Sequence, residues 1–196
     1  FKTGLQGVAR AIAAQKGIEV RAGSPAQSVA HSGGRYVVKT ADGQEFSGDA
    51  LVIALPSAPA ARLVHDINPG LADHFTKLRY ADVDSVGVVV KKKNVSLKPV
   101  AAIISPNDTF FSMVSRDTVP DDNFRGFAFH FRPGLDDNAK FKRIMEVLGI
   151  SRSKIEHAVD KKNVVPSLRL GHKEWADKTD QLLGNVRNLY MTGNYY

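Results

Sequence analysis

The apolar run ALVIAL, Ala50 to Leu55, constrains the fold of this chain more than any other segment. Strands that are apolar at every position are typical of parallel sheets whose two faces are both buried. Pro56 ends the run, and the segment Ser57-Ala58-Pro59 can begin a helix, because proline is favoured in the first helical turn. The pattern therefore predicts a strand that is buried on both faces, followed by a helix to about His65.

Upstream of this run, the sequence predicts a helix and a small antiparallel meander. Apolar residues at helical spacing predict an amphipathic helix over residues 4–16, which Thr3 can cap and Gly17 can end. Ser32-Gly33-Gly34 and Asp42-Gly43 are strong signals for hairpin turns. Short strands are expected around these turns at residues 18–21, 26–30, 35–40 and 44–46.

The character of the chain changes near residue 80, where longer strands begin. Turn signals at Pro106-Asn107-Asp108 and Pro120-Asp121-Asp122 separate some of these strands, and Ser151 can cap a further helical turn. The expected strands lie at residues 83–91, 100–105, 110–115, 126–131, 162–168 and 188–192, and the expected helices at residues 70–78, 136–148 and 173–183. We therefore expect an α+β fold with two domains, formed by residues 1–79 with 170–196 and by residues 80–169.

Composition excludes several classes of protein. The chain has 196 residues, of which 43% are hydrophobic and 24% charged, as in ordinary globular proteins. No apolar run approaches the roughly 20 residues that span a bilayer. The absence of cysteine excludes disulfides and thiolate metal sites and is compatible with a cytoplasmic location. The net charge is +7, but no aromatic residues are interleaved with the Lys91-Lys92-Lys93 run, so we expect no nucleic acid partner.

The sequence contains no motif of a self-sufficient active site. No pair of the six histidines has the spacing of a zinc helix, so each is interpreted as structural and no metal site is predicted. The G-x-S-x-G elbow of serine hydrolases and the G-x-x-x-x-G-K-[ST] loop of P-loop enzymes are both missing. No catalytic acid or base can therefore be named from motifs alone.

Two parts of the chain resemble the flavin-dependent amine oxidase and protoporphyrinogen oxidase family. FKTGLQGVARAIAAQ is similar to that family's segment in which a glycine and a short motif precede a helix. IEVRAGSPAQSVAHSGGRYVVKTADGQEFSGDALVIALPSAP follows with the family's order of strands and hairpin. Near the other end, VVPSLRLGHKEW resembles a stretch of protoporphyrinogen oxidases, and NLYMTGNYY resembles the strand that precedes the last flavin-contacting helix. The resemblance covers residues 1–65 and 163–196.

The resemblance implies an FAD-dependent oxidoreductase and assigns roles to particular residues. Residues 1–79 with 170–196 would form a partial FAD-binding domain, and residues 80–169 would form a substrate-binding domain. The cofactor-binding residues implied by the motifs are Ala26, Ala54, Pro56, Pro166, Gly193 and Asn194. The carboxylates of a porphyrinogen substrate would pair with Arg116, Arg125 or Arg132.

The family's G-x-G-x-x-G fingerprint, which seats the cofactor's pyrophosphate on a helix N-terminus, does not occur in this sequence. The chain also lacks an initiator methionine and begins inside a helical pattern. We therefore expect a fragment that is inactive by itself.

Alternatives remain open at this stage. Within the enzyme class, an amine oxidase or a carotenoid-desaturase-like flavoenzyme is the second hypothesis, and an aromatic cage containing Trp175 would favour the amine oxidase. Outside the enzyme class, the chain could be a non-catalytic α+β binding module. The expected partner is a small-molecule substrate, and a peripheral contact with a membrane is left open.

Overall fold

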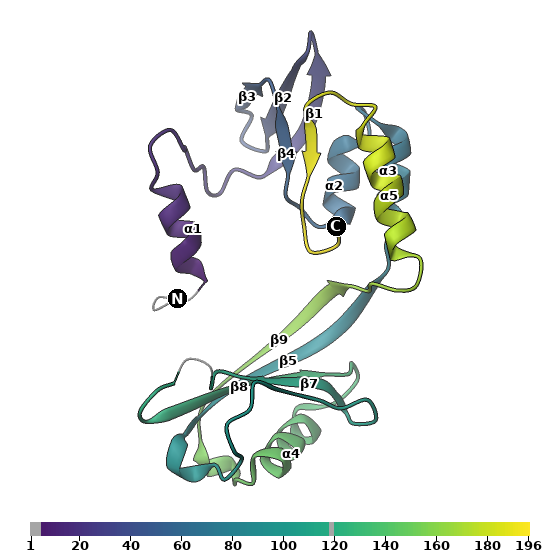
Figure 1. The fold of residues 1–196 in the computed structure, drawn as a ribbon. Coiled ribbons are helices and arrows are strands. Elements are labelled where there is room, and N and C mark those ends of the chain that lie inside the picture. The colour runs from purple at the N-terminus through teal and green to yellow at the C-terminus, as the bar shows by residue number, and fades with distance from the viewer. Residues whose placement is uncertain (1–4, 118–119) are drawn as a thin grey trace. The chain divides into compact units, whose positions relative to one another are not determined.

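The computed structural model describes residues 5–117 and 120–196 and divides into two compact units. The first unit contains Phe1–Leu78 and Leu168–Tyr196, and the second contains Arg79–Ser167 (Figure 1). Each unit has a hydrophobic core of its own.

The first unit begins with α1, Gln6–Ala13, followed by an antiparallel meander. The expected hairpin turns are confirmed, because Gly33, Gly34 and Gly43 all have positive φ angles that suit residues without a side chain. Thr3, the expected cap of α1, lies outside the described residues. The strands of the meander are β1 Ala26–Ser32, β2 Arg35–Thr40 and β3 Glu45–Gly48.

Two short parallel strands and three helices complete the first unit. β4, Leu51–Ile53, pairs in parallel with β10, Leu189–Met191, so segments far apart in the sequence lie side by side (Figure 1). The helices are α2 Ser57–Val64, α3 Pro69–Thr76 and α5 His172–Leu183. Buried side chains of α2 and α3 pack with β4 and β10 in one core, and α5 adds partly buried leucines to it.

Some sequence expectations for the first unit are wrong. Residues 18–21 form no strand, because their short apolar segment has no partner strand in the described chain. The apolar run 50–55 contributes only the three residues of β4 to a strand. The run is also not buried on both faces, since Val52 is 61% exposed and its neighbour Tyr190 is 54% exposed.

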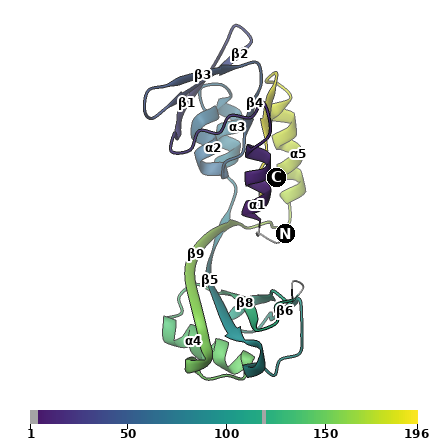
Figure 2. The same cartoon turned by 90° about the vertical axis from the view of Figure 1, so that its left-hand side faces the viewer.

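The second unit is built on a five-stranded antiparallel sheet with the order β6-β7-β8-β5-β9. Its longest ladder joins β5 to β9, and β9 begins at Ile155, well before the expected residue 162. The strands are β5 Tyr80–Lys91, β6 Ala102–Ile104, β7 Phe110–Ser115, β8 Phe124–Phe131 and β9 Ile155–Pro166. Figure 2 shows the paired β5 and β9 from a second side.

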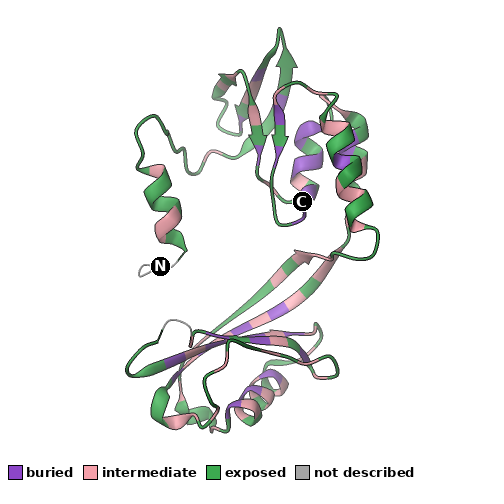
Figure 3. Cartoon of the chain, in the orientation of Figure 1, coloured by how far each residue is buried: buried purple, intermediate pink, exposed green. Residues whose placement is uncertain are grey.

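One face of this sheet is covered by α4, Asp137–Leu148. Asp136 caps the helix by accepting a hydrogen bond from the backbone N–H of Ala139, and Gly149 ends it in the left-handed conformation. Along β5 and β8, buried residues alternate with partly exposed ones, as expected for a sheet with one covered face (Figure 3). Short 3-10 turns flank the sheet at Lys92–Asn94 and Arg152–Lys154, and Ser151 makes no capping hydrogen bond to the second.

No helix in residues 5–117 and 120–196 is long and apolar enough to cross a membrane. The same residues contain no group of His, Asp and Glu side chains arranged to hold a metal ion.

Candidate functional site

The carboxyl ends of β4 and β10 lie next to each other in the first unit. The parallel pairing matches Ile53 with Met191, and the backbone N–H of Thr192 donates to the carbonyl of Ile53 at 3.0 Å. The pairing therefore brings together four of the expected cofactor residues at one edge, although they are far apart in the sequence. They are Ala54, Pro56, Gly193 and Asn194, and all four are exposed.

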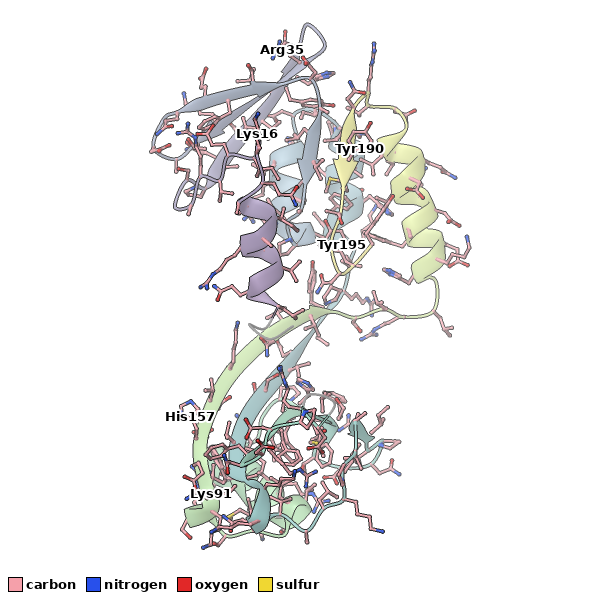
Figure 4. The ribbon with its side chains drawn as sticks, turned by 60° about the vertical axis from the view of Figure 1, so that its left-hand side comes forward. Lys16, Arg35, Lys91, His157, Tyr190 and Tyr195 are labelled. Atoms are coloured by element: carbon pink, nitrogen blue, oxygen red, sulfur yellow. The ribbon has the colours of Figure 1, made fainter. Side chains whose placement is uncertain are left out.

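The buried ring of Tyr195 leaves no room for a side chain at position 193, so this position requires glycine. Tyr195 is 1% exposed, its ring packs edge-on against Phe75 and Trp175, and its hydroxyl donates to the carbonyl of Leu55 at 2.9 Å. Figure 4 labels Tyr195 beside the end of β10. A Cβ atom on Gly193 would lie only 2.5 Å from Cε1 of this ring. Because Gly193 has no side chain, the chain can turn here and place the ring of Tyr195 in the core of the first unit, next to the end of β4.

We expect Gly193→Ala to destabilise the protein by about 1–3 kcal/mol, because the added methyl group must displace a buried aromatic ring. Urea unfolding measures the loss, and near-UV circular dichroism reports the packing of the tyrosine. Gly184→Ala is the control, since its added Cβ makes contacts of 3.4 Å or more. Equal stability of the Gly193→Ala variant and the wild type would contradict this role.

The other two expected cofactor residues lie elsewhere. Ala26 begins β1, where it pairs with Thr40 and is exposed. Pro166 ends β9 in the second unit, where it pairs with Tyr80 and is half-buried.

Trp175 is packed among aromatic rings in the first unit. It stacks with His74 at 4.9 Å and with His172 at 5.5 Å between ring centroids. Nε2 of His74 also lies 2.9 Å from the carbonyl of Trp175, which ties α3 to α5. These contacts give Trp175 a role in packing the helices of this unit.

In the second unit, the sheet face opposite α4 remains uncovered. The strand register aligns its residues in rows across β7, β8, β5 and β9. One row holds Arg116, Gly126, Val89 and His157, the next Val114, Ala128, Gly87 and Val159, and the third Ser112, His130, Ser85 and Lys161. All of these side chains are half-buried or exposed, so nothing in the described part of the unit covers them. We call these three rows the open face.

The open face is flat at its centre and basic at its margins. Gly87 and Ala128 leave the centre almost free of side chains, and a shallow cavity of about 230 Å³ lies there. A larger cavity of about 490 Å³ adjoins it, and Arg116 and Gly126 line both. His157, labelled in Figure 4, projects from β9 at one margin. Among the residues of the three rows, none carries a carboxylate, so the face favours anionic ligands.

The three candidate arginines have different environments. Arg125 lies on the covered face, where Nε and Nη2 donate to the carboxylate of Asp117 at 2.9 and 2.6 Å and Nη1 donates to the carbonyl of Leu97. Hydrogen bonding and charge from Arg125 outweigh the effect of burial, so that the pKa of Asp117 is lowered. The guanidinium of Arg132 donates to the carbonyls of Pro106 and Asp108.

Arg116 differs from both. It is exposed, and its side chain has no hydrogen bond or ion pair to any residue in 5–117 or 120–196. Its aliphatic stem lies over Gly126, where an added Cβ would come within 3.1 Å of Cγ. Of the three arginines, Arg116 therefore has the guanidinium that is available to a ligand.

A polar cluster that includes two residues of the open face was not predicted from the sequence. Ser85 Oγ lies 2.9 Å from Nδ1 of His130, and Nδ2 of Asn163 donates to Ser85 Oγ at 2.8 Å. The three residues come from three adjacent strands, β8, β5 and β9. Only the strand register brings them together, because no motif links positions so far apart in the chain.

The chain has the fold of one part of known flavoenzymes, an α/β unit with a parallel strand pair joined to an antiparallel sheet. Residues 1–128 match the flavin containing amine oxidoreductase family, and the chain belongs to that family. No curated protein matches the chain significantly.

Three solved structures have a similar fold. A putative protoporphyrinogen oxidase from Exiguobacterium sp. 255-15 has a TM-score of 0.77 at 16% identity, over 100% of this chain and 47% of that one. A putrescine oxidase double mutant has a TM-score of 0.65 at 12% identity, and a fatty acid isomerase from P. acnes has 0.58 at 12% identity. Each of these two matches covers 97% of this chain and 47% of the other. The chain thus spans about half the length of these structures.

Proposed function

We propose that this chain is the downstream part of an FAD-dependent oxidoreductase of the protoporphyrinogen oxidase type, which oxidises a carboxylate-bearing substrate. The first unit would hold part of the cofactor, and the second would bind the substrate. The observation that carries the proposal is the open face, whose centre is flat and whose margins hold basic side chains without a carboxylate.

The family implies a flavin, and the residues at the carboxyl edge of β4 and β10 fit its polar part. The amide of Asn194 is exposed and has no hydrogen-bond partner among the residues that the structure describes, so it can donate to and accept from ribityl or phosphate oxygens. Ala54 and Pro56 border the same edge, where ligands of open α/β sheets bind. When bound, the flavin would supply the oxidising chemistry by accepting a hydride equivalent.

The open face suits an apolar, anionic substrate better than an amine. A flat ring system can lie on Gly87 and Ala128, beside the stem of Arg116, because these two residues have little or no side chain. The free guanidinium of Arg116 can then pair with a carboxylate at the margin. An ammonium group would instead be placed beside Arg116 and Lys161, with no carboxylate on this face to offset the repulsion.

The proposal is tested in the full-length flavoprotein by replacing Ala128 with glutamate and, as a matched control, with glutamine. We expect Ala128→Glu to raise the KM for protoporphyrinogen about tenfold more than Ala128→Gln does, because only glutamate repels the carboxylates. The difference should shrink in high salt. Oxidation is followed by the fluorescence of the porphyrin product.

A panel of substrates separates the proposal from its main alternative. Anaerobic flavin reduction is measured with protoporphyrinogen and with putrescine. Reduction by protoporphyrinogen alone is the expected result. Faster reduction by the amine, or equal KM values for the glutamate and glutamine variants, would show that the open face does not select an anionic substrate.

A further inference from the structure

The hydrogen bonds of Ser85 determine which nitrogen of His130 is available to a ligand. Ser85 Oγ accepts from the amide of Asn163, so its own O–H remains to be donated, and Nδ1 of His130 is 2.9 Å away. A neutral imidazole that accepts at Nδ1 carries its proton on Nε2. Nε2 has no partner among the residues that the structure describes. The cluster therefore presents the Nε2–H of His130 as a donor, and the hydrogen bond from Ser85 to Nδ1 fixes the orientation of the ring.

The place of His130 makes this donor useful. Its row adjoins the row of Ala128 and Gly87, so the imidazole stands beside the flat centre of the open face. The neighbours in its own row are Ser112, Ser85 and Lys161, none of which is acidic. A ligand lying on Ala128 and Gly87 would bring an oxygen atom, rather than a protein carboxylate, to Nε2.

We propose that His130 contacts the substrate by donating a hydrogen bond from Nε2 to one of its oxygen atoms, and that Ser85 and Asn163 are positioning residues for His130. This inference rests on the proposed function of the open face as the substrate-binding surface. It adds a specificity-determining residue beside the flat centre of the face, separate from Arg116 at the margin. Substrates that lack an oxygen acceptor at this position should bind less tightly than those that have one.

Two conservative substitutions distinguish a substrate contact from a structural role. Glutamine places its terminal amide near the position of Nε2, whereas asparagine places its amide near the position of Nδ1. If His130 contacts the substrate, His130→Gln should stay within about threefold of the wild type. His130→Asn and His130→Leu should each raise KM about tenfold, as expected for the loss of one hydrogen bond, with a smaller change in kcat.

The experiment uses the full-length flavoprotein with two readouts. KM and kcat for protoporphyrinogen come from steady-state kinetics, and the Kd of the porphyrin product comes from a fluorescence titration of the flavin-loaded protein. When His130 is intact, Ser85→Ala and Asn163→Leu should each raise both KM and Kd three- to tenfold. They should have no effect when combined with His130→Leu, because a positioning residue acts only through the residue it positions. Ser153→Ala, an exposed serine of the turn Arg152–Lys154 outside the three rows, is the control and should change neither constant.

The outcomes are distinct. Wild-type constants in His130→Asn together with weakened binding in His130→Gln would mean that only Nδ1 matters, and would overturn the proposal. Wild-type constants in all three His130 variants would overturn it as well, while leaving the proposed function intact. If the wild-type protein neither oxidises protoporphyrinogen nor binds the porphyrin, the proposed function fails and this inference fails with it. Should His130→Leu not fold, the glutamine and asparagine variants still decide the question.

Discussion

Replacing Lys140 with methionine is expected to lower the free energy of unfolding by about 3–5 kcal/mol, because it leaves a buried carboxylate without its counter-charge. Lys140 is 3% exposed, and its Nζ lies 3.1 Å from Asp84 on β5 and 3.4 Å from Asp160 on β9. Burial alone would lower the pKa of Lys140, but these carboxylates outweigh burial and raise it, so the amine is charged at neutral pH. The ion pairs join α4 to two strands of the sheet.

Urea or thermal unfolding measures this effect, and two further variants interpret it. Lys142→Met is the matched control, because Lys142 is exposed on the same helix. Lys140→Met combined with Asp84→Val should recover much of the lost stability, since an apolar pair replaces the ion pair without leaving a buried charge. A Lys140→Met protein as stable as Lys142→Met would show that the cluster is not a structural clamp.

Replacing Arg125 with methionine is expected to cost a similar 3–5 kcal/mol for the same reason. The side chains of Arg125 and Asp117 are 7% and 12% exposed, and the guanidinium makes two hydrogen bonds to the carboxylate. The pH dependence gives a second readout. The folded-state pKa of Asp117 is below its ordinary value of 3.8, so the ion pair with Arg125 stabilises the protein fully above about pH 3.8. This stabilisation is lost as the pH falls through the folded-state pKa of Asp117. Over the same pH range, the free energy of unfolding of Arg125→Met should fall less than that of the wild type.

Arg116→Met is the comparison for Arg125→Met. Arg116 is exposed and unpaired in the described part of the chain, so we expect its loss to change stability by less than about 0.5 kcal/mol. The KM for an anionic substrate should rise instead. If Arg125→Met leaves stability unchanged and raises KM, then the roles of the two arginines assigned here are reversed.

Short-range patterns in the sequence determine most of the secondary structure. The apolar spacing in residues 136–148 indicates α4, and Asp136 and Gly149 mark its limits because a carboxylate caps an N-terminus and glycine adopts the left-handed conformation. The glycines at positions 33, 34 and 43 likewise fix the turns of the meander. The order of motifs at both ends also indicates the family, which the match over residues 1–128 confirms.

Strand limits are less predictable, because a strand depends on its partner. The segment 18–21 has strand-like residues and no strand beside it, so it forms none. β9 starts at Ile155, earlier than its own sequence indicates, because β5 offers a long partner. Exposure is equally non-local, and the apolar Val52 is exposed because no described segment covers that face of β4.

By itself, the sequence determined the helices, the turns and the family, since each depends on residues that are close together in the chain or on motifs that can be read in order. Only the tertiary structure decided which of three similar arginines has a free guanidinium. It also decided that the packing of Tyr195 requires glycine at position 193. The cluster of Ser85, His130 and Asn163 likewise appears only in the tertiary structure. These facts depend on strand register and side-chain packing. A shift of one residue in register would turn every open-face residue of a strand to the side that α4 covers.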